Sequence, residues 1–235
     1  MSQHGEDYSF VPEHFSGRAR LFPLPNLVLF PHVMQPLHIF EPRYVDLFRD
    51  ALEDDRLIAM ALLNPGWEDD YEGRPPIAPV ACLGRVVTWQ AQPNDCYNLL
   101  LLGVGRIQVL QELPSDRLFR TAEVEVLEDD YPLATAEARP ALHRKLISAF
   151  EKMLPHINDA EEMFNQLSVN SISLGTLTDV ISYALDMDIR CKQSLLAEPN
   201  VECRAKLLLK YLGKAAQESR ACKLAAGFPP AFSPN

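Results

Sequence analysis

The stretch that decides the fold is residues 21–44, LFPLPNLVLFPHVMQPLHIFEPRY. It is dense in apolar residues, yet prolines interrupt it at positions 23, 25, 31, 36 and 42. Because proline removes a backbone donor and clashes with the preceding helical turn, a helix is excluded over most of this stretch. Short, bent edge strands tolerate proline and can still bury a hydrophobic face. The residues expected in the core are Leu24, Leu27, Leu29, Phe30, Val33, Leu37, Ile39 and Phe40.

Composition and charge narrow the class of protein. The chain has 235 residues and a formal net charge of −10, which weighs against nucleic acid as the main partner because phosphate binding needs a positive footprint. The five cysteines include no C-x-x-C pair and no zinc-like spacing, so no metal is expected and reduced thiols predict a cytoplasmic protein. No leader peptide and no membrane-spanning stretch is recognisable, and no membrane partner is expected.

Outside this stretch, a polar tail over residues 1–17 is expected to precede a β-subdomain over residues 18–132. The expected elements are a helix over 43–54, strands over 57–63, 80–90, 97–110 and 119–128, and a loop over 64–79 that is too broken for any element. Gly84 predicts a β-bulge, and Gly103 and Gly105 predict a bend in the long strand. The result is a small, bent, mostly antiparallel sheet, plausible as a barrel.

Residues 133–217 change to helical periodicity and predict a helical bundle, so the fold class is α+β. The expected helices begin near Pro140, at about Ala160, after a cap at Ser173, at Ile189, and at Val201 after a cap at Asn200. In the last of these, Arg204, Lys206, Lys210 and Lys214 are expected on a solvent face. Residues 218–235 are expected to form a second tail.

Four blocks in the right order resemble the N-terminal, substrate-binding domain of Lon-type ATP-dependent proteases. They are the opening LFPLP to IFEPRY, VACLGR at 80–85, LLLLGVGRI at 99–107 and the helical segment 178–206. The sequence IFEPRY most resembles that of free-standing members of this family and of the related part of cereblon-type proteins. The resemblance covers about residues 18–217 and implies a PUA-like sheet.

A complete Lon-type protease carries an ATPase and a Ser-Lys protease module after this domain. The present sequence has no G-x-x-x-x-G-K-[ST] phosphate loop, and no segment resembles the catalytic serine motif. The resemblance therefore implies a non-catalytic chain without a cofactor, which would hand a substrate on only in trans.

Five residues are candidates for substrate contact. Trp67 and Tyr71 are amphipathic aromatics in the loop over 64–79, although packing back onto the domain itself is favoured over free presentation. Arg43 lies two residues after Glu41, where a local ion pair is favoured over ligand contact. Arg85 and Arg106 each follow a glycine on a strand, which favours a buried stem with an exposed head over recognition.

The leading hypothesis is a substrate-recognition module that binds unfolded or apolar polypeptide segments in protein quality control, as an adaptor or chaperone-like factor. It would work with a protease or chaperone in trans, and self-association stays open. The alternative is a small-molecule or RNA-binding PUA-like module, with RNA disfavoured by the acidic charge. An independent hydrolase has no supporting motif.

Overall fold

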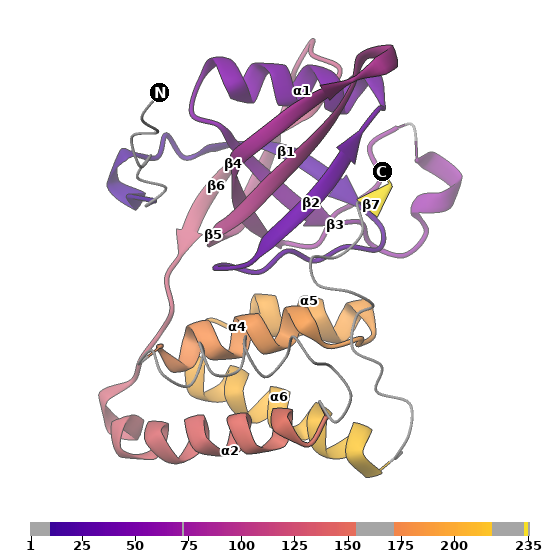
Figure 1. The fold of residues 1–235 in the computed structure, drawn as a ribbon. Helices are drawn as coiled ribbons and strands as arrows, with labels where there is room; N and C mark the ends of the chain where they lie inside the picture. The colour runs from indigo at the N-terminus through magenta and orange to yellow at the C-terminus, as the bar shows by residue number, and fades with distance from the viewer. Residues whose placement is uncertain (1–9, 72, 154–171, 218–232, 235) are drawn as a thin grey trace, which may run out of the picture. The chain divides into compact units, whose positions relative to one another are not determined.

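The computed structural model of the chain describes residues 10–71, 73–153, 172–217 and 233–234 (Figure 1). The chain divides into two compact units: unit 1 comprises residues 1–127 and 229–235, and unit 2 comprises residues 128–228. Unit 1 holds the sheet and unit 2 is helical, so the α+β prediction is confirmed. The limits drawn from the sequence, 18–132 and 133–217, stay a prediction.

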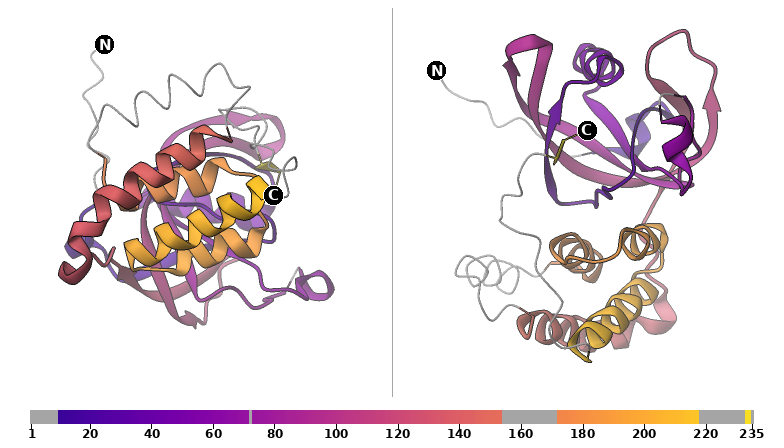
Figure 2. Two further views of the ribbon diagram at one scale, coloured as in Figure 1. Left: turned by 90° about the horizontal axis from the view of Figure 1, so that it is seen from below. Right: turned by 90° about the vertical axis from the view of Figure 1, so that its right-hand side faces the viewer.

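The strands of unit 1 form a sheet that closes on itself. Their bounds are β1 (Arg18–Leu24), β2 (Met34–Ile39), β3 (Leu57–Leu62), β4 (Val80–Gln92), β5 (Cys96–Leu113), β6 (Arg120–Leu127) and β7 (Ser233–Pro234). Neighbours are antiparallel except for the β1–β3 and β2–β7 pairs. Because β4 bonds to both β3 and β5, the order β4-β3-β1-β6-β5 is a closed ring, and the strand curvature is visible in Figure 2.

The interior of this barrel is lined by small and medium apolar side chains. They alternate along each strand, as the two-residue period of a strand requires. The interior set is Ala19, Leu21, Leu57, Ala59, Ala61, Ala81, Leu83, Ile107, Ala122 and Val124. Every residue of β3 is buried, which confirms the prediction of a strand covered on both faces.

The prolines of the organising stretch sit where a missing donor is tolerated. β1 pairs with β6 only through Arg18–Leu21 and with β3 only through Leu21–Leu24, so Pro23 has a neighbouring strand on one side alone. Pro42 occupies the first turn of helix α1 (Pro42–Glu53), which packs against β1 and β3. Phe40, predicted to be buried, is 42% exposed because it follows the inward-facing Ile39 by one residue. Leu27 is only half buried.

Two glycines shape the long strands. A register shift between Leu83 and Gly84 confirms the predicted bulge. At Gly103 the backbone of the loop before β2 lies directly against the strand: His32 N–H donates to Gly103 O at 2.8 Å, and Gly103 N–H donates to Val33 O at 2.9 Å. A Cβ at position 103 would lie 2.0 Å from the carbonyl oxygen of Phe30. Only glycine fits there.

The segment over 64–79 is the predicted loop, but the expectation that it holds no element is wrong. It contains the short 3-10 helix η2 (Trp67–Asp70), which follows Gly66 in the left-handed region. Three further 3-10 turns are described, η1 (Pro12–His14), η3 (Pro93–Asp95) and η4 (Leu133–Ala138).

Unit 2 contains four described α-helices: α2 (Arg139–Glu151), α4 (Leu174–Ala184), α5 (Ile189–Ala197) and α6 (Val201–Gln217). The predicted caps are confirmed, because Ser173 Oγ accepts from Thr176 N–H and Asn200 Oδ1 accepts from Cys203 N–H. The helix expected over 160–167 lies outside the described residues. The expectation that Arg204 faces solvent is wrong, because its exposed fraction is 0%.

Candidate functional site

A pocket of about 220 Å³ opens on unit 1 between segments that are distant in the sequence. Four segments contribute: β1, the start of α1, the loop after β3 and the segment leading into β6. The lining residues are Leu21, Pro23, Arg43, Tyr44, Leu63, Tyr71, Gly73, Arg74, Pro75, Leu118, Phe119 and Arg120. Every charged residue among these described lining residues is an arginine.

Two of the lining residues, Arg43 and Tyr71, form a cluster with Glu41, which is not itself in the lining. Arg43 donates to Glu41 through Nη2 at 2.7 Å and to the backbone oxygen of Tyr71 through Nη1 at 3.0 Å. The Tyr71 hydroxyl donates to the second Glu41 oxygen at 2.9 Å, and the Arg43 guanidinium lies 4.6 Å from the centre of the Tyr71 ring. The loop after β3 is therefore tied to the start of α1 by charge-assisted hydrogen bonds.

Burial and neighbouring charges shift the pKa values of Arg43 and Tyr71. Burial alone would lower the pKa of Arg43, but electrostatic interactions with Tyr44 and Glu41 and the hydrogen bond to Glu41 raise it above its ordinary value. Burial, together with the hydrogen bond to Glu41, raises the pKa of Tyr71. At neutral pH Arg43 is a cation and Tyr71 is a hydrogen-bond donor.

Trp67 is half buried on η2, with its ring centre 5.5 Å from that of Tyr71 in an edge-to-face arrangement. Trp67 and Tyr71 therefore lie together beside the pocket, and of these two only Tyr71 lines it. The local ion pair expected between Glu41 and Arg43 is present as well.

Another part of the lining is centred on Arg120 at the start of β6. Its guanidinium binds both carboxylate oxygens of Glu112, with Nε donating at 2.9 Å, and Nη1 donates to Pro75 O at 2.9 Å. Leu118 also belongs to the lining, and its side chain is 66% exposed. Arg74 also lines the pocket, and its side chain is exposed and makes no ion pair with any described residue.

Two of the five candidate residues lie elsewhere. Arg85 is on β4 and Arg106 is on β5, and neither lines the pocket. Arg106 is 3% exposed, so the expected exposed head is wrong for it. No sequence pattern indicates Arg74, Leu118 and Arg120, because they are brought together by a contact between segments about 45 residues apart, as between Arg120 and Pro75.

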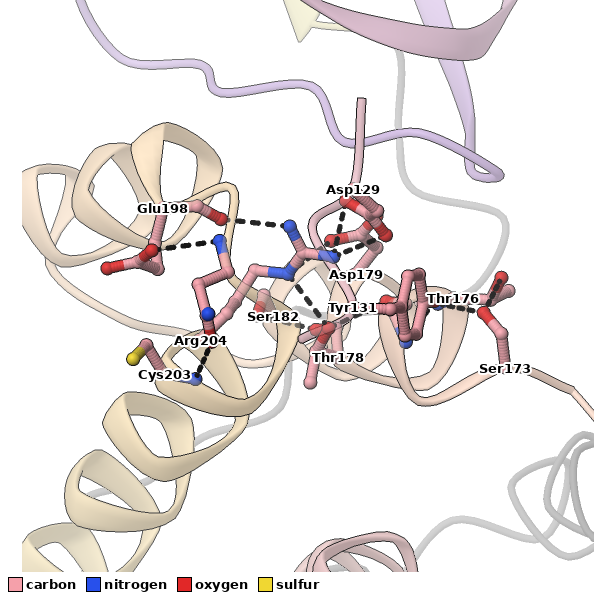
Figure 3. A network of polar contacts seen from close by, with 12 residues as sticks. Asp129, Tyr131, Ser173, Thr176, Thr178, Asp179, Ser182, Glu198, Cys203 and Arg204 are labelled. Carbon is pink, nitrogen blue, oxygen red and sulfur yellow. Dashed lines mark hydrogen bonds and ion pairs between the residues drawn. The ribbon is translucent and has the colours of Figure 1, made fainter. Parts of the chain in front are cut away.

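A second polar cluster lies in unit 2 and centres on Arg204 of α6 (Figure 3). Arg204 Nη2 donates to both Asp129 oxygens at 2.8 and 2.7 Å, Nη1 to Glu198 O at 2.9 Å, and Nε to Thr178 Oγ1 at 3.1 Å. Asp179 lies 3.6 Å from Nε and its side chain is 1% exposed. Because each guanidinium nitrogen already has a protein partner, we assign this cluster to stability.

The described residues show neither a metal site nor a membrane-spanning helix. Within residues 10–71, 73–153, 172–217 and 233–234, no group of three or more His, Cys, Asp or Glu residues could hold a metal ion. No helix among those residues is both long and apolar enough to cross a bilayer.

Comparison with known proteins places this fold in a family. The family profile for the ATP-dependent protease La (LON) substrate-binding domain matches residues 18–214. The chain belongs to this family. The Lon protease of Anaeromyxobacter dehalogenans is 28% identical over 196 residues, which cover 83% of the chain and 23% of that protein. The Lon protease of Dictyoglomus thermophilum is also 28% identical, over 82% of the chain and 24% of its own length.

Solved structures agree with the fold of a Lon substrate-binding domain. The N-terminal domain of the Mycobacterium avium complex Lon protease aligns with a TM-score of 0.66 at 13% identity, over 83% of the chain and 98% of that domain. The Lon N-terminal domain protein from Xanthomonas campestris aligns with a TM-score of 0.59 at 22% identity, over the same shares. The predicted family is confirmed. The chain spans only about a quarter of the length of the Lon proteases it matches.

A first prediction concerns the loop after β3 of this Lon substrate-binding domain. Replacing Arg43 with alanine removes its bonds to Glu41 and Tyr71, so we expect about 1–2 kcal/mol of lost stability and faster tryptic cleavage after Arg74. Limited proteolysis followed by mass spectrometry measures the cleavage rate. Arg49→Ala on the same helix is the control, because the Arg49 side chain contacts Asp95 and Tyr97. Equal cleavage rates in the two variants would contradict the prediction.

Proposed function

We propose that this chain binds segments of other polypeptides through the pocket bounded by α1, the loop after β3 and Leu118, and that it leaves their covalent bonds intact. The proposal rests on the composition of the pocket lining in a Lon substrate-binding fold. The lining combines an exposed apolar rim with arginine and tyrosine donors. Pockets of mixed character hold an apolar anchor and orient it by a few polar contacts.

The lining residues that the structure describes include tyrosine and arginine but no Ser, Cys, His or Lys, the usual nucleophiles and bases of peptide hydrolysis. Burial raises the pKa of Tyr44, and the Tyr44 hydroxyl donates to Pro23 O at 2.8 Å. This tyrosine is therefore engaged in structure. These features support recognition without catalysis.

The wider role that we propose is recognition in protein quality control, in which the bound segment passes to a protease or chaperone in trans. The support for this step is family membership, because the relatives matched along the chain are Lon proteases. The pocket volume of about 220 Å³ lies below the usual range of small-molecule sites, which favours one or two side chains of a longer ligand.

The test is fluorescence anisotropy with a labelled, reduced and carboxymethylated polypeptide as the unfolded ligand. Saturable binding in the micromolar range is expected, with no binding of the same polypeptide in its native fold. Leu118→Ser should weaken binding about tenfold, because the exposed leucine offers the apolar contact at the rim. Leu133→Ser is the matched control, since Leu133 is 90% exposed and belongs to unit 2. Absence of saturable binding, or saturable binding of single-stranded RNA in its place, would overturn the proposal.

A further inference from the structure

The three arginines that line the pocket differ in how their charge is balanced. Arg43 is paired with Glu41, and Arg120 is paired with both oxygens of Glu112. Neither carboxylate lines the pocket itself. Arg74 has no ion pair with any residue that the structure describes, and its side chain is exposed beside the opening.

Acidic side chains lie near the pocket without being among its described lining residues. Glu68, Asp69 and Asp70 belong to η2 and are exposed, and the Asp70 carboxylate lies where a Cβ on Gly73 would be. Among the residues that the structure describes, the lining presents three guanidinium groups and no carboxylate. A ligand atom inside the pocket is therefore near positive charge. One of the three arginines, Arg74, forms no ion pair with any described residue and can bind the ligand.

Much of the remaining lining is apolar. Leu21, Leu63, Leu118 and Phe119 supply hydrocarbon surface, and Leu118 leaves two thirds of its area in water. A ligand that contacts both the apolar surface and the guanidinium groups carries an apolar side chain and an anionic group a few bonds away. A planar carboxylate matches a guanidinium fork in two parallel hydrogen bonds.

We propose that the pocket takes a carboxylate carried by an apolar polypeptide segment, with Arg74 as its principal partner. The chain terminus and an Asp or Glu side chain offer the same chemistry. This inference rests on the proposed function and specifies the class of segment that is bound. A single uncommitted guanidinium matches the single charge of a carboxylate better than the higher charge of a phosphate ester.

The experiment uses three N-acetylated apolar tetrapeptides and isothermal titration calorimetry on the full chain. The first peptide has a free carboxyl terminus, the second a carboxamide terminus, and the third a carboxamide terminus with one internal aspartate. We expect the free acid to bind about tenfold more tightly than the amide, the gain of one charge-assisted contact. If the third peptide binds like the first, a side-chain carboxylate suffices, whereas binding like the second assigns the pocket to the chain terminus.

The variant Arg74→Ala should remove the advantage of the free acid and leave the amide unchanged, while Arg74→Lys should restore part of it. Arg144→Ala is the control, because it removes an equal charge from an exposed position of α2 in unit 2. Equal affinities of acid and amide, or an Arg74→Ala loss that is the same for both peptides, would overturn this inference. If the unfolded polypeptide still binds in that case, the proposed function stands. If the unfolded polypeptide fails while the free acid retains its advantage, the proposed function falls and the carboxylate site remains.

Discussion

Replacing Gly103 with alanine is expected to destabilise unit 1 by about 4 kcal/mol, a large effect for a single methyl group. The added Cβ would lie 2.0 Å from Phe30 O and 2.8 Å from Phe30 C. Both are backbone atoms, so no rotamer change relieves the contact. The loop before β2 must move away from β5, and the hydrogen bonds that link Gly103 to His32 and Val33 are then lost.

Tryptophan fluorescence during urea unfolding measures this loss, because both tryptophans of the chain, Trp67 and Trp89, lie in unit 1. The matched control is Gly105→Ala on the same strand. A Cβ there would lie 3.6 Å from Phe10, an ordinary van der Waals contact, so little change is expected. A Gly103→Ala protein as stable as Gly105→Ala would show that the loop before β2 is not held against β5.

Replacing Arg204 with methionine is expected to destabilise unit 2 by about 3–5 kcal/mol. Methionine fills much of the space but cancels no charge. The substitution leaves the Asp179 carboxylate, whose side chain is 1% exposed, and the Asp129 carboxylate without their cation. The cost of keeping the Asp179 carboxylate buried without Arg204, rather than the lost attraction, dominates the effect.

Far-UV circular dichroism follows this unfolding, because unit 2 holds four of the five described α-helices. Lys206→Met is the control, since Lys206 is exposed on the same helix and should change stability by less than about 0.5 kcal/mol. Adding Asp179→Asn to Arg204→Met should recover part of the loss by removing one uncompensated charge. If Arg204→Met and Lys206→Met have equal stability, the buried network contributes nothing and our assignment is wrong.

Local patterns were sufficient for most of the architecture. Proline spacing separated strand from helix in the organising stretch, and the continuous apolar run of β3 indicated a strand buried on both faces. Gly84 was identified as a bulge because a glycine inside a strand has few other uses. Each of these inferences depends on neighbours in the sequence.

The errors came from contacts between distant parts of the chain. Arg204 was placed on a solvent face because it is a charged residue near three lysines of α6, but its partner Asp129 lies 75 residues away. Gly103 was identified as a bend, yet the physical reason for a glycine is the approach of Phe30, which no strand pattern reveals.

In the candidate site, too, local sequence patterns indicate single residues, whereas contacts between distant segments bring those residues together. Tyr71 and Arg43 were chosen one at a time, from loop composition and from the start of a helix, and the structure joins them across 28 residues. Arg74 and Leu118 carried no local signal. Their significance lies in facing a shared pocket, and the sequence alone does not show which segments meet.

The alanines inside the barrel have an evolutionary consequence. The barrel diameter depends on four small interior residues, Ala59, Ala61, Ala81 and Ala122. A bulkier residue at any of these positions would push the strands apart. Because side chains fill the barrel interior, it does not offer a ligand site. New ligand preferences must then arise at the mouth, where connecting segments can be lengthened or exchanged without disturbing the strands. Divergence among distant relatives should accordingly concentrate there, while these four positions keep small side chains.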